Sequence, residues 1–344
     1  MPAHSEHQRD LVVIGGSAGS LEVLPHVLGS LPADLPAAVL VVVHSSADDS
    51  TGLVRVLDRC GPLPVVAATH DAPLEPGRVY VAVAGRHLLV RERKMLLSVA
   101  PKQNRARPSI DALFRSAARW GGSRTVAVLL SGSLDDGAVG LAAIHAAGGA
   151  CVVQDPDDAL YPSMPQAGLA VVPHAEMLPG KEIAFGIQAL LSERVESSTF
   201  SPDADLVKET DMAENRAGTA PSDQPGRPAA MSCPDCTGGM NIVESAGVVH
   251  YTCHSGHIWS PQSLVAAQQD KIEEAMWTAV SILDEQARVY DLLADGRAGM
   301  VERHQRAAAT EIRQAAETIR KHFPEIVLDT EISLPVPQRA EGSA

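Results

Sequence analysis

The chain has 344 residues, of which 45% are hydrophobic, 20% charged and 3% aromatic. This length accommodates two or three domains. Its 28 Lys and Arg against 42 Asp and Glu give a formal net charge of −14, which disfavours nucleic-acid binding and attachment to an anionic membrane. The first ten residues are polar, and no apolar run approaches the roughly 18 residues of a membrane-spanning helix. We therefore expect a cytoplasmic protein without membrane insertion.

The first part of the chain alternates patterns typical of buried strands and amphipathic helices. Strands are predicted at 11–14, 38–43, 79–83, 126–131 and 151–154, helices at 21–28, 51–60, 109–120 and 138–147, and a hairpin at 87–99. Strands rich in Val and Leu, separated by helices, are typical of a mostly parallel sheet covered on both faces. The predicted fold over 8–192 is therefore α/β and doubly wound, a Rossmann-like arrangement of three layers.

The composition changes after this domain. Residues 193–230 carry eight acidic and four basic residues with one aromatic, which predicts a flexible linker. Residues 231–260 hold a cysteine cluster. Beyond them, apolar positions recur at spacings of three and four, which predicts a helical hairpin over 261–324 before a tail at 325–344.

The first predicted strand ends in Gly15-Gly16-Ser17-Ala18-Gly19, directly before a predicted helix. This stretch matches G-x-S-x-G, the pattern of a nucleophile elbow that lifts a serine hydroxyl above the sheet edge. A phosphate-binding turn or a plain tight turn are the alternatives. The dinucleotide fingerprint is absent, because Ser17 and Ser20 stand where it requires glycine.

Polar residues also follow two other predicted strands: His44 follows the strand at 38–43, and the pair Asp135-Asp136 lies in the loop after the strand at 126–131. The carboxyl ends of parallel strands converge on one crevice. A weakly nucleophilic serine needs a base within reach and a carboxylate that orients the base. We therefore expect Ser17, His44 and one of Asp135 or Asp136 to meet, although a structural histidine and helix-capping aspartates are alternatives.

Several motifs occur in order across this domain. They are Val12 to Gly19, Val43-His44, Arg107 to Ala118, Leu130 to Gly140, Gln154-Asp155-Pro156 and Ser163 to Ala167. Over about residues 10–192 they resemble the methylesterase domain of the CheB family, the chemotaxis-receptor protein-glutamate methylesterases. The resemblance implies that Ser17 is the nucleophile, His44 its base and Asp136, rather than Asp135, the aspartate. It also implies that the backbone amides of Ala18 and Ser133 stabilise the oxyanion.

The reaction implied by the resemblance is hydrolysis of glutamate γ-methyl esters on the cytoplasmic helices of chemotaxis receptors, through an acyl-enzyme and without a catalytic cofactor. Some family members also deamidate glutamines. The sequence departs from the family pattern at Gly16, Ser20 and Leu134, the last of which stands where the best-known members carry glycine. The alternative is a catalytically impaired regulatory or binding protein of a chemotaxis-like system.

The familiar family members carry an N-terminal phosphoacceptor receiver domain. Here about nine residues precede the first predicted strand. We therefore expect no receiver domain and no regulation by phosphorylation in cis.

The cysteine cluster has the spacing of a zinc ribbon. Cys233 and Cys236 are followed, after sixteen residues, by Cys253 and then by His257 at the fourth position beyond it. Three thiolates and one imidazole close a tetrahedral Zn²⁺ shell, which indicates a structural role. His254 competes for the fourth place, but the longer spacing favours His257. The module or the helical tail is expected to dock a signalling partner.

Overall fold

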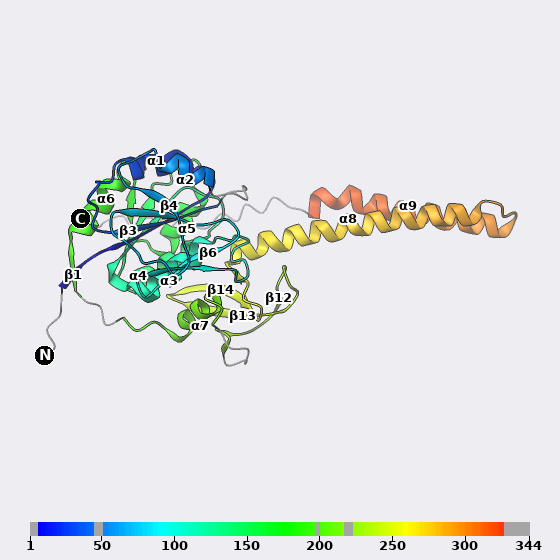
Figure 1. Cartoon of the computed structure of the whole chain (residues 1–344). Coiled ribbons are helices and arrows are strands. Elements are labelled where there is room, and N and C mark those ends of the chain that lie inside the picture. The colour runs from blue at the N-terminus through cyan, green and yellow to red at the C-terminus, as the bar shows by residue number, and fades with distance from the viewer. Residues whose placement is uncertain (1–5, 45–50, 197–199, 217–222, 327–344) are drawn as a thin grey trace, which may run out of the picture. The chain divides into compact units, whose positions relative to one another are not determined.

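The computed structural model describes residues 6–44, 51–196, 200–216 and 223–326 (Figure 1). These residues fall into two compact units that are divided between Ser263 and Leu264. The first unit contains a sheet domain and the cysteine-rich module, and the second contains most of a helical hairpin. None of the helices in these ranges has the length and apolar character that crossing a membrane requires.

A seven-stranded sheet forms the centre of the first unit. Its strands are β2 (Leu11–Gly16), β3 (Ala38–Val43), β4 (Val65–Ala67), β5 (Arg78–Val81), β8 (Thr125–Leu129), β9 (Ala150–Gln154) and β10 (Glu176–Leu178). The spatial order is β10-β9-β8-β2-β3-β5-β4, and neighbouring strands are parallel throughout. The predicted α/β class is confirmed, and β2 lies between β3 and β8.

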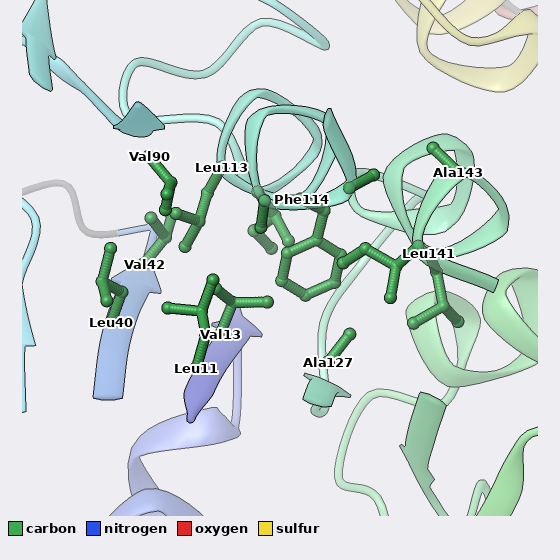
Figure 2. Packing of buried hydrophobic residues seen from close by; sticks show 14 of the residues in the cluster. Leu11, Val13, Leu40, Val42, Val90, Leu113, Phe114, Ala127, Leu141 and Ala143 are labelled. Atoms are coloured by element: carbon green, nitrogen blue, oxygen red, sulfur yellow. The ribbon is translucent and has the colours of Figure 1, made fainter. Parts of the chain in front are cut away.

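Helices cover both faces of this sheet. One face packs against α1 (Ser20–Gly29), α2 (Thr51–Leu57) and α6 (Ile183–Ser192), and the other against α3 (Ile110–Gly121), α4 (Ala138–Ala146) and α5 (Ser163–Val171). A 3₁₀ turn, Gly122–Arg124, follows α3. Successive side chains of a strand point to opposite faces. Leu11 and Val13 therefore face Phe114 of α3 (Figure 2), whereas Val12 and Ile14 belong to the core on the α1 side.

The predicted hairpin is present as β6 (His87–Arg91) and β7 (Lys94–Ser98), which pair antiparallel. Two short strands and two helices of the sheet domain were not predicted. β4 and β10 have three residues each, too few to show a hydrophobic period. Helix α5 contains Pro165 and Gly168, and α6 contains Gly186; these residues interrupt a helical pattern in the sequence.

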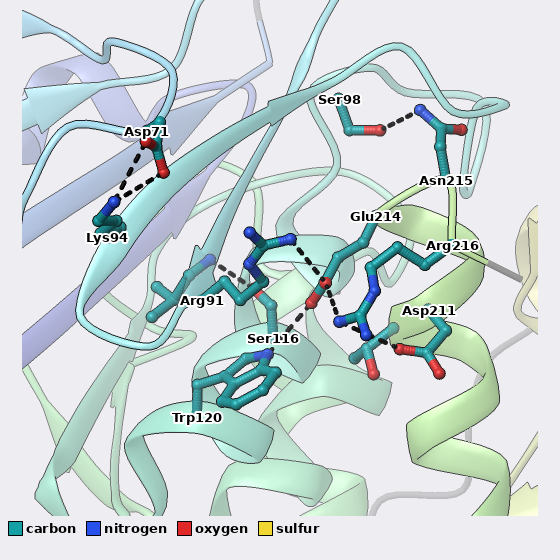
Figure 3. Close-up of polar contacts among 12 residues, drawn as sticks. Asp71, Arg91, Lys94, Ser98, Ser116, Trp120, Asp211, Glu214, Asn215 and Arg216 are labelled. Carbon is teal, nitrogen blue, oxygen red and sulfur yellow. Dashed lines mark hydrogen bonds and ion pairs between the residues drawn. The ribbon is translucent and has the colours of Figure 1, made fainter.

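The segment predicted as a flexible linker contains a helix, α7 (Ala204–Ala213), with Leu206 and Met212 buried. Figure 3 shows how the end of α7 is held. The Nε1 of Trp120 on α3 donates to Glu214 at 3.1 Å, and Asn215 donates to the Ser98 hydroxyl at 3.3 Å. This part of the chain therefore differs from the prediction of a flexible linker. Its polar and charged side chains form hydrogen bonds with the sheet domain, which the composition alone does not reveal.

The linker segment also contributes strand β11 (Arg194–Glu196), which pairs antiparallel with β1 (Glu6–Gln8). Next come β12 (Arg227–Ser232), β13 (Gly239–Ser245), β14 (Val248–Cys253) and β15 (Ile258–Trp259), a four-stranded antiparallel sheet that carries the cysteines.

Two long helices end the described chain, α8 (Pro261–Ala294) and α9 (Met300–Ile326). Between them Gly296 and Gly299 adopt φ angles of 75° and 72°, a region that glycine enters without steric cost. The predicted cysteine-rich module and helical hairpin are thus both present.

Candidate active site

The turn between β2 and α1 presents Ser17 at the carboxyl edge of the sheet. Gly19, at the N-cap of α1, has a φ of 77°, and a Cβ built there would lie 2.7 Å from the Ser131 hydroxyl. The Ser17 N–H donates to the Ser131 carbonyl at 2.9 Å. The turn is therefore tied to the loop that follows β8.

The two departures at this turn, Gly16 and Ser20, fit each other. A Cβ at Gly16 would lie 2.5 Å from the Ser20 Cβ, so the Ser20 side chain occupies the space that any side chain at position 16 would need. The Ser20 hydroxyl donates to the Ser17 carbonyl at 2.6 Å. This pair preserves the sharp turn that holds Ser17.

Strands β3 and β8 flank β2, and their ends bring His44 and the loop before α4 to the same edge. The Nε2 of His44 lies 2.9 Å from Oδ2 of Asp136. Ser17, His44 and Asp136 line a single cavity of about 470 Å³, together with the loop at 102–108, Ser133 and Leu134. The three residues predicted from the strand ends are thus brought together.

Asp136 is buried at the N-terminus of α3. It accepts hydrogen bonds from the Asn104 amide, the Ser109 hydroxyl and the backbone N–H groups of Ile110 and Asp111, at 2.7 to 3.2 Å. Burial alone would raise the pKa of Asp136, but His44 and these donors hold it below its ordinary value. The start of a helix also favours negative charge. Asp136 is therefore a carboxylate at neutral pH.

A second buried carboxyl group, Asp111, lies beside Asp136. The Asn104 Nδ2 donates to both, at 2.7 Å to Asp111 and 2.9 Å to Asp136. Burial and the nearby charge of Asp136 raise the pKa of Asp111 to about 7. The negative charge of this pair thus resides mainly on Asp136. No role was predicted for Asn104 or Asp111, because a loop residue and a helix residue carry no pattern that reveals such a contact.

The structure separates the roles of the two adjacent aspartates. Asp135 does not contact His44. Its Oδ1 accepts hydrogen bonds from the hydroxyls of Ser260 and Ser263, at 2.6 and 3.0 Å. Burial raises the pKa of Asp135 to about 6, although these two hydroxyls oppose the increase. Of the pair, Asp136 is the one that contacts the histidine.

The backbone amides of Ala18 and Ser133 are the two that the sequence predicted as donors to an oxyanion. Ala18 follows Ser17, and Ser133 lines the cavity. Among the residues that the structure describes, neither N–H has a hydrogen-bond partner. Leu134, next to Ser133, has a φ of 62° and is 39% exposed. The residue that replaces the family glycine thus occupies a conformation that favours glycine.

Leu134→Gly is expected to raise the free energy of unfolding by about 1 kcal/mol relative to Leu134→Ala, because only glycine relieves the left-handed backbone. Leu134→Ala is the matched control, since it removes the side chain but keeps the strain. Urea denaturation of both variants measures the difference. Equal stability of the two would contradict a strained loop.

His87 fixes the loop that borders the cavity. Its Nε2 donates to the Pro101 carbonyl at 2.9 Å, and its Nδ1 accepts from the Ser109 N–H at 3.2 Å. This pattern requires a neutral ring, and burial lowers the pKa of His87 to about 4. Sequence reasoning did not single out His87, because it lies within an ordinary hairpin strand.

A pH dependence of stability follows from His87. Between pH 6.5 and 4 the unfolded chain binds a proton at this ring that the folded chain does not. Its contribution to the free energy of unfolding therefore falls by about 3 kcal/mol as the pH drops through this window. Urea denaturation across this range measures the difference in free energy of unfolding between the protein and His87→Gln. We expect this difference to become smaller by about 3 kcal/mol as the pH falls from 6.5 to 4. A difference that is independent of pH would refute this.

The cysteine-rich module gathers Cys233, Cys236, Cys253 and His257, whose ligand atoms all lie within 4.8 Å of one another. The Cys253 Sγ is 3.6 Å from the Cys236 Sγ and 3.5 Å from Nδ1 of His257. Tetrahedral zinc, with Zn–S of about 2.3 Å and Zn–N of about 2.0 Å, separates its ligands by about 3.5–3.8 Å. The cluster is thus consistent with a structural metal site, and His254 is not part of it.

Residues 12–187 match the family model described as CheB methylesterase. A protein-glutamate methylesterase/protein-glutamine glutaminase of Anaeromyxobacter dehalogenans is 40% identical over 181 residues, which are 53% of each chain. One of Bordetella avium is 38% identical over 183 residues, 53% of this chain and 54% of the relative. The chain thus spans about half the length of these curated relatives.

The crystal structure of the Thermotoga maritima CheB methylesterase catalytic domain aligns with a TM-score of 0.52 and 28% identity. The alignment covers 54% of this chain and 100% of that domain. The matched region contains the sheet, Ser17, His44 and Asp136. The cysteine-rich module and helical hairpin lie beyond the family match, and the chain belongs to the CheB methylesterase family.

Proposed function

We propose that the chain is a protein-glutamate methylesterase with Ser17 as nucleophile, His44 as general base and Asp136 as the carboxylate that orients His44. The observation that carries this proposal is the convergence of the three side chains on one cavity, with His44 held by a buried, multiply hydrogen-bonded Asp136. The names of the curated relatives support the same reaction.

In the proposed reaction the Ser17 Oγ attacks the carbonyl carbon of a glutamate γ-methyl ester. Asp136 engages Nε2 of His44, so Nδ1 is the ring nitrogen left to take the Ser17 proton. Asp136 stabilises the imidazolium that forms, and the amides of Ala18 and Ser133 donate to the oxyanion. His44 then gives the proton to departing methanol, and an acyl-enzyme ester remains on Ser17.

A water molecule completes the cycle. His44 takes a proton from it, the resulting hydroxide attacks the acyl-enzyme, and glutamate is released as Ser17 recovers its proton. A glutamine side chain would follow the same route with ammonia as the leaving group. Deamidation is therefore a second activity of the same site, as the relatives' names suggest.

The rim of the cavity favours an acidic substrate. Lys102, Arg105 and Arg107 all line it, in a chain whose net charge is −14. A local basic rim on an acidic protein attracts negatively charged segments. This supports glutamate-rich cytoplasmic helices of chemotaxis receptors as the substrate, and hence a cytoplasmic site of action.

Methanol release from methyl-labelled receptor fragments tests the proposed function. The full chain is expected to release labelled methanol, and Ser17→Ala is expected to release none while it keeps the same melting temperature. Absence of release from the folded chain would reject the esterase. Binding of methylated fragments without turnover would instead favour a catalytically impaired protein that only recognises its target. The presence of Leu134 beside Ser133 is the structural feature that supports this alternative.

We further propose that the cysteine-rich module holds a structural Zn²⁺ ion through three thiolates and His257. Cys253→Ser is expected to lose the ion, because it removes a buried ligand. Cys60→Ser is the matched control, since Cys60 lies outside the cluster. Atomic emission of the purified variants should give one zinc per chain for the control. Stoichiometric zinc in Cys253→Ser would reject the ligand set.

A further inference from the structure

Asn104 connects the candidate active site to the cysteine-rich module. Its backbone N–H donates to the Ile258 carbonyl at 2.8 Å, and its side-chain Oδ1 accepts from the Ser260 N–H at 2.8 Å. Residues 258–260 directly follow His257, a proposed ligand of the metal cluster. Asn104 is thus held by two hydrogen bonds to residues 258–260, the segment that follows the cluster.

The other side of the same amide faces the buried carboxyl groups. The Asn104 Nδ2 donates to Asp111 and Asp136. An asparagine amide has one oxygen and two N–H donors, and here all are used. Because Ser260 requires the oxygen, the N–H donors must face the carboxyl groups. Without Ser260, the amide would be free to turn its oxygen toward a carboxylate.

Two further links join the same segments. The hydroxyls of Ser260 and Ser263 bind Asp135, the residue before Asp136. Gln103 forms a parallel bridge with Ile258 and accepts a hydrogen bond from Arg115 of α3. The contacts are buried: Asn104 is 6% exposed, Gln103 1% and Ser260 2%. Residues 103–104 and the Asp135-Asp136 pair are therefore both attached to the end of the module.

We infer that the cysteine-rich module braces the active site: the segment at 258–260 positions Asn104, and Asn104 positions Asp136 against His44. The inference rests on the proposed catalytic role of Asp136. Asn104 and Ser260 are positioning residues, which act through Asp136. A module outside the family match thereby sets how well Asp136 and His44 are aligned, and loss of its metal ion lowers turnover.

Asn104→Asp tests the positioning role. It keeps an acceptor for Ser260 and tolerates the φ of 48° at this position, but it replaces the donor to Asp136 with a carboxylate oxygen. We expect kcat to fall about 10- to 100-fold with little change in KM, since a hydrogen bond to a charged group is lost. Asn241→Asp is the matched control, because that amide lies in the module and contacts the Pro225 carbonyl. Equal kcat in both variants would overturn the inference.

Hydrogen exchange in the full chain gives a readout independent of activity. After a chelator removes the metal ion, the N–H groups of Asn104, Ile110 and Asp111 are expected to exchange at least about tenfold faster, while strand residues 11–16 keep their protection. Unchanged protection at these three amides would overturn the inference. Equal acceleration in 11–16 would also overturn it, because general unfolding would then be the cause.

The two experiments separate this inference from the proposed function. A chain without esterase activity on any substrate would reject the proposed function, while the exchange rates would still show whether the module holds residues 104–111. An active chain in which amide exchange at Asn104, Ile110 and Asp111 does not respond to removal of the metal ion would reject only the inference that the module positions the active site.

Discussion

Asp136→Asn is expected to lower kcat by about four orders of magnitude, as loss of the carboxylate does in serine triads. Asp136 accepts hydrogen bonds from four groups besides His44. An asparagine would direct an N–H group at one or more of these donors, and it would not stabilise the imidazolium. The rate of methanol release at saturating substrate measures the effect.

Asp135→Asn is the matched control for this experiment. Its side chain retains an acceptor oxygen for the Ser260 and Ser263 hydroxyls, and it makes no contact with His44. We expect kcat to stay within about tenfold, since only hydrogen bonds that remain possible are altered. Equal losses of kcat in the two variants would show that kcat depends on the conformation of the loop at Asp135 and Asp136 and not on the charge of Asp136.

Arg115→Met is expected to lower the free energy of unfolding by about 3 kcal/mol, because it removes a buried cation that offsets the charge of Glu209 and donates to Gln103. Arg115 of α3 and Glu209 of α7 are 2% and 1% exposed, and Arg115 Nε lies 4.0 Å from Glu209 Oε2. Glu209 also pairs with His250 of β14. Burial alone would raise the pKa of Glu209, but His250 and Arg115 hold it below its ordinary value.

The double variant Arg115→Met/Glu209→Met controls for this effect. An apolar pair of similar volume removes the buried charge that Arg115 had offset, so part of the lost stability should return. Urea denaturation of the single and double variants measures it. A double variant that is less stable than Arg115→Met would contradict the view that Glu209 depends on the charge of Arg115.

The central sheet could be predicted because the signal for a buried strand is local in the sequence. Strands such as β2 and β3 are buried on both faces, and such strands appear in a sequence as unbroken runs of Val and Leu. The helix α7 could not be predicted in this way. Its polar residues are satisfied by α3 and the β6–β7 hairpin (Figure 3), and such partners are visible only after the chain has folded.

The same distinction applies to the site. Ser17, His44 and Asp136 each follow a parallel strand, so the topology of the sheet brings them together. The cluster of three cysteines and His257 was predictable because ligand spacing is a local property. Asn104 and Ser260 are 156 positions apart in the chain, and no motif relates them. Their contact depends on where the module packs, which no local pattern in the sequence specifies.

The most direct test of the account is to find which residue becomes covalently modified by a fluorophosphonate, a reagent that reacts with activated serines. The full chain is incubated with the reagent, and the adduct is located by peptide mass spectrometry. The account predicts one adduct, on Ser17, and its loss in His44→Ala. An adduct on Ser131 or Ser133, or labelling of Ser17 that does not depend on His44, would contradict it.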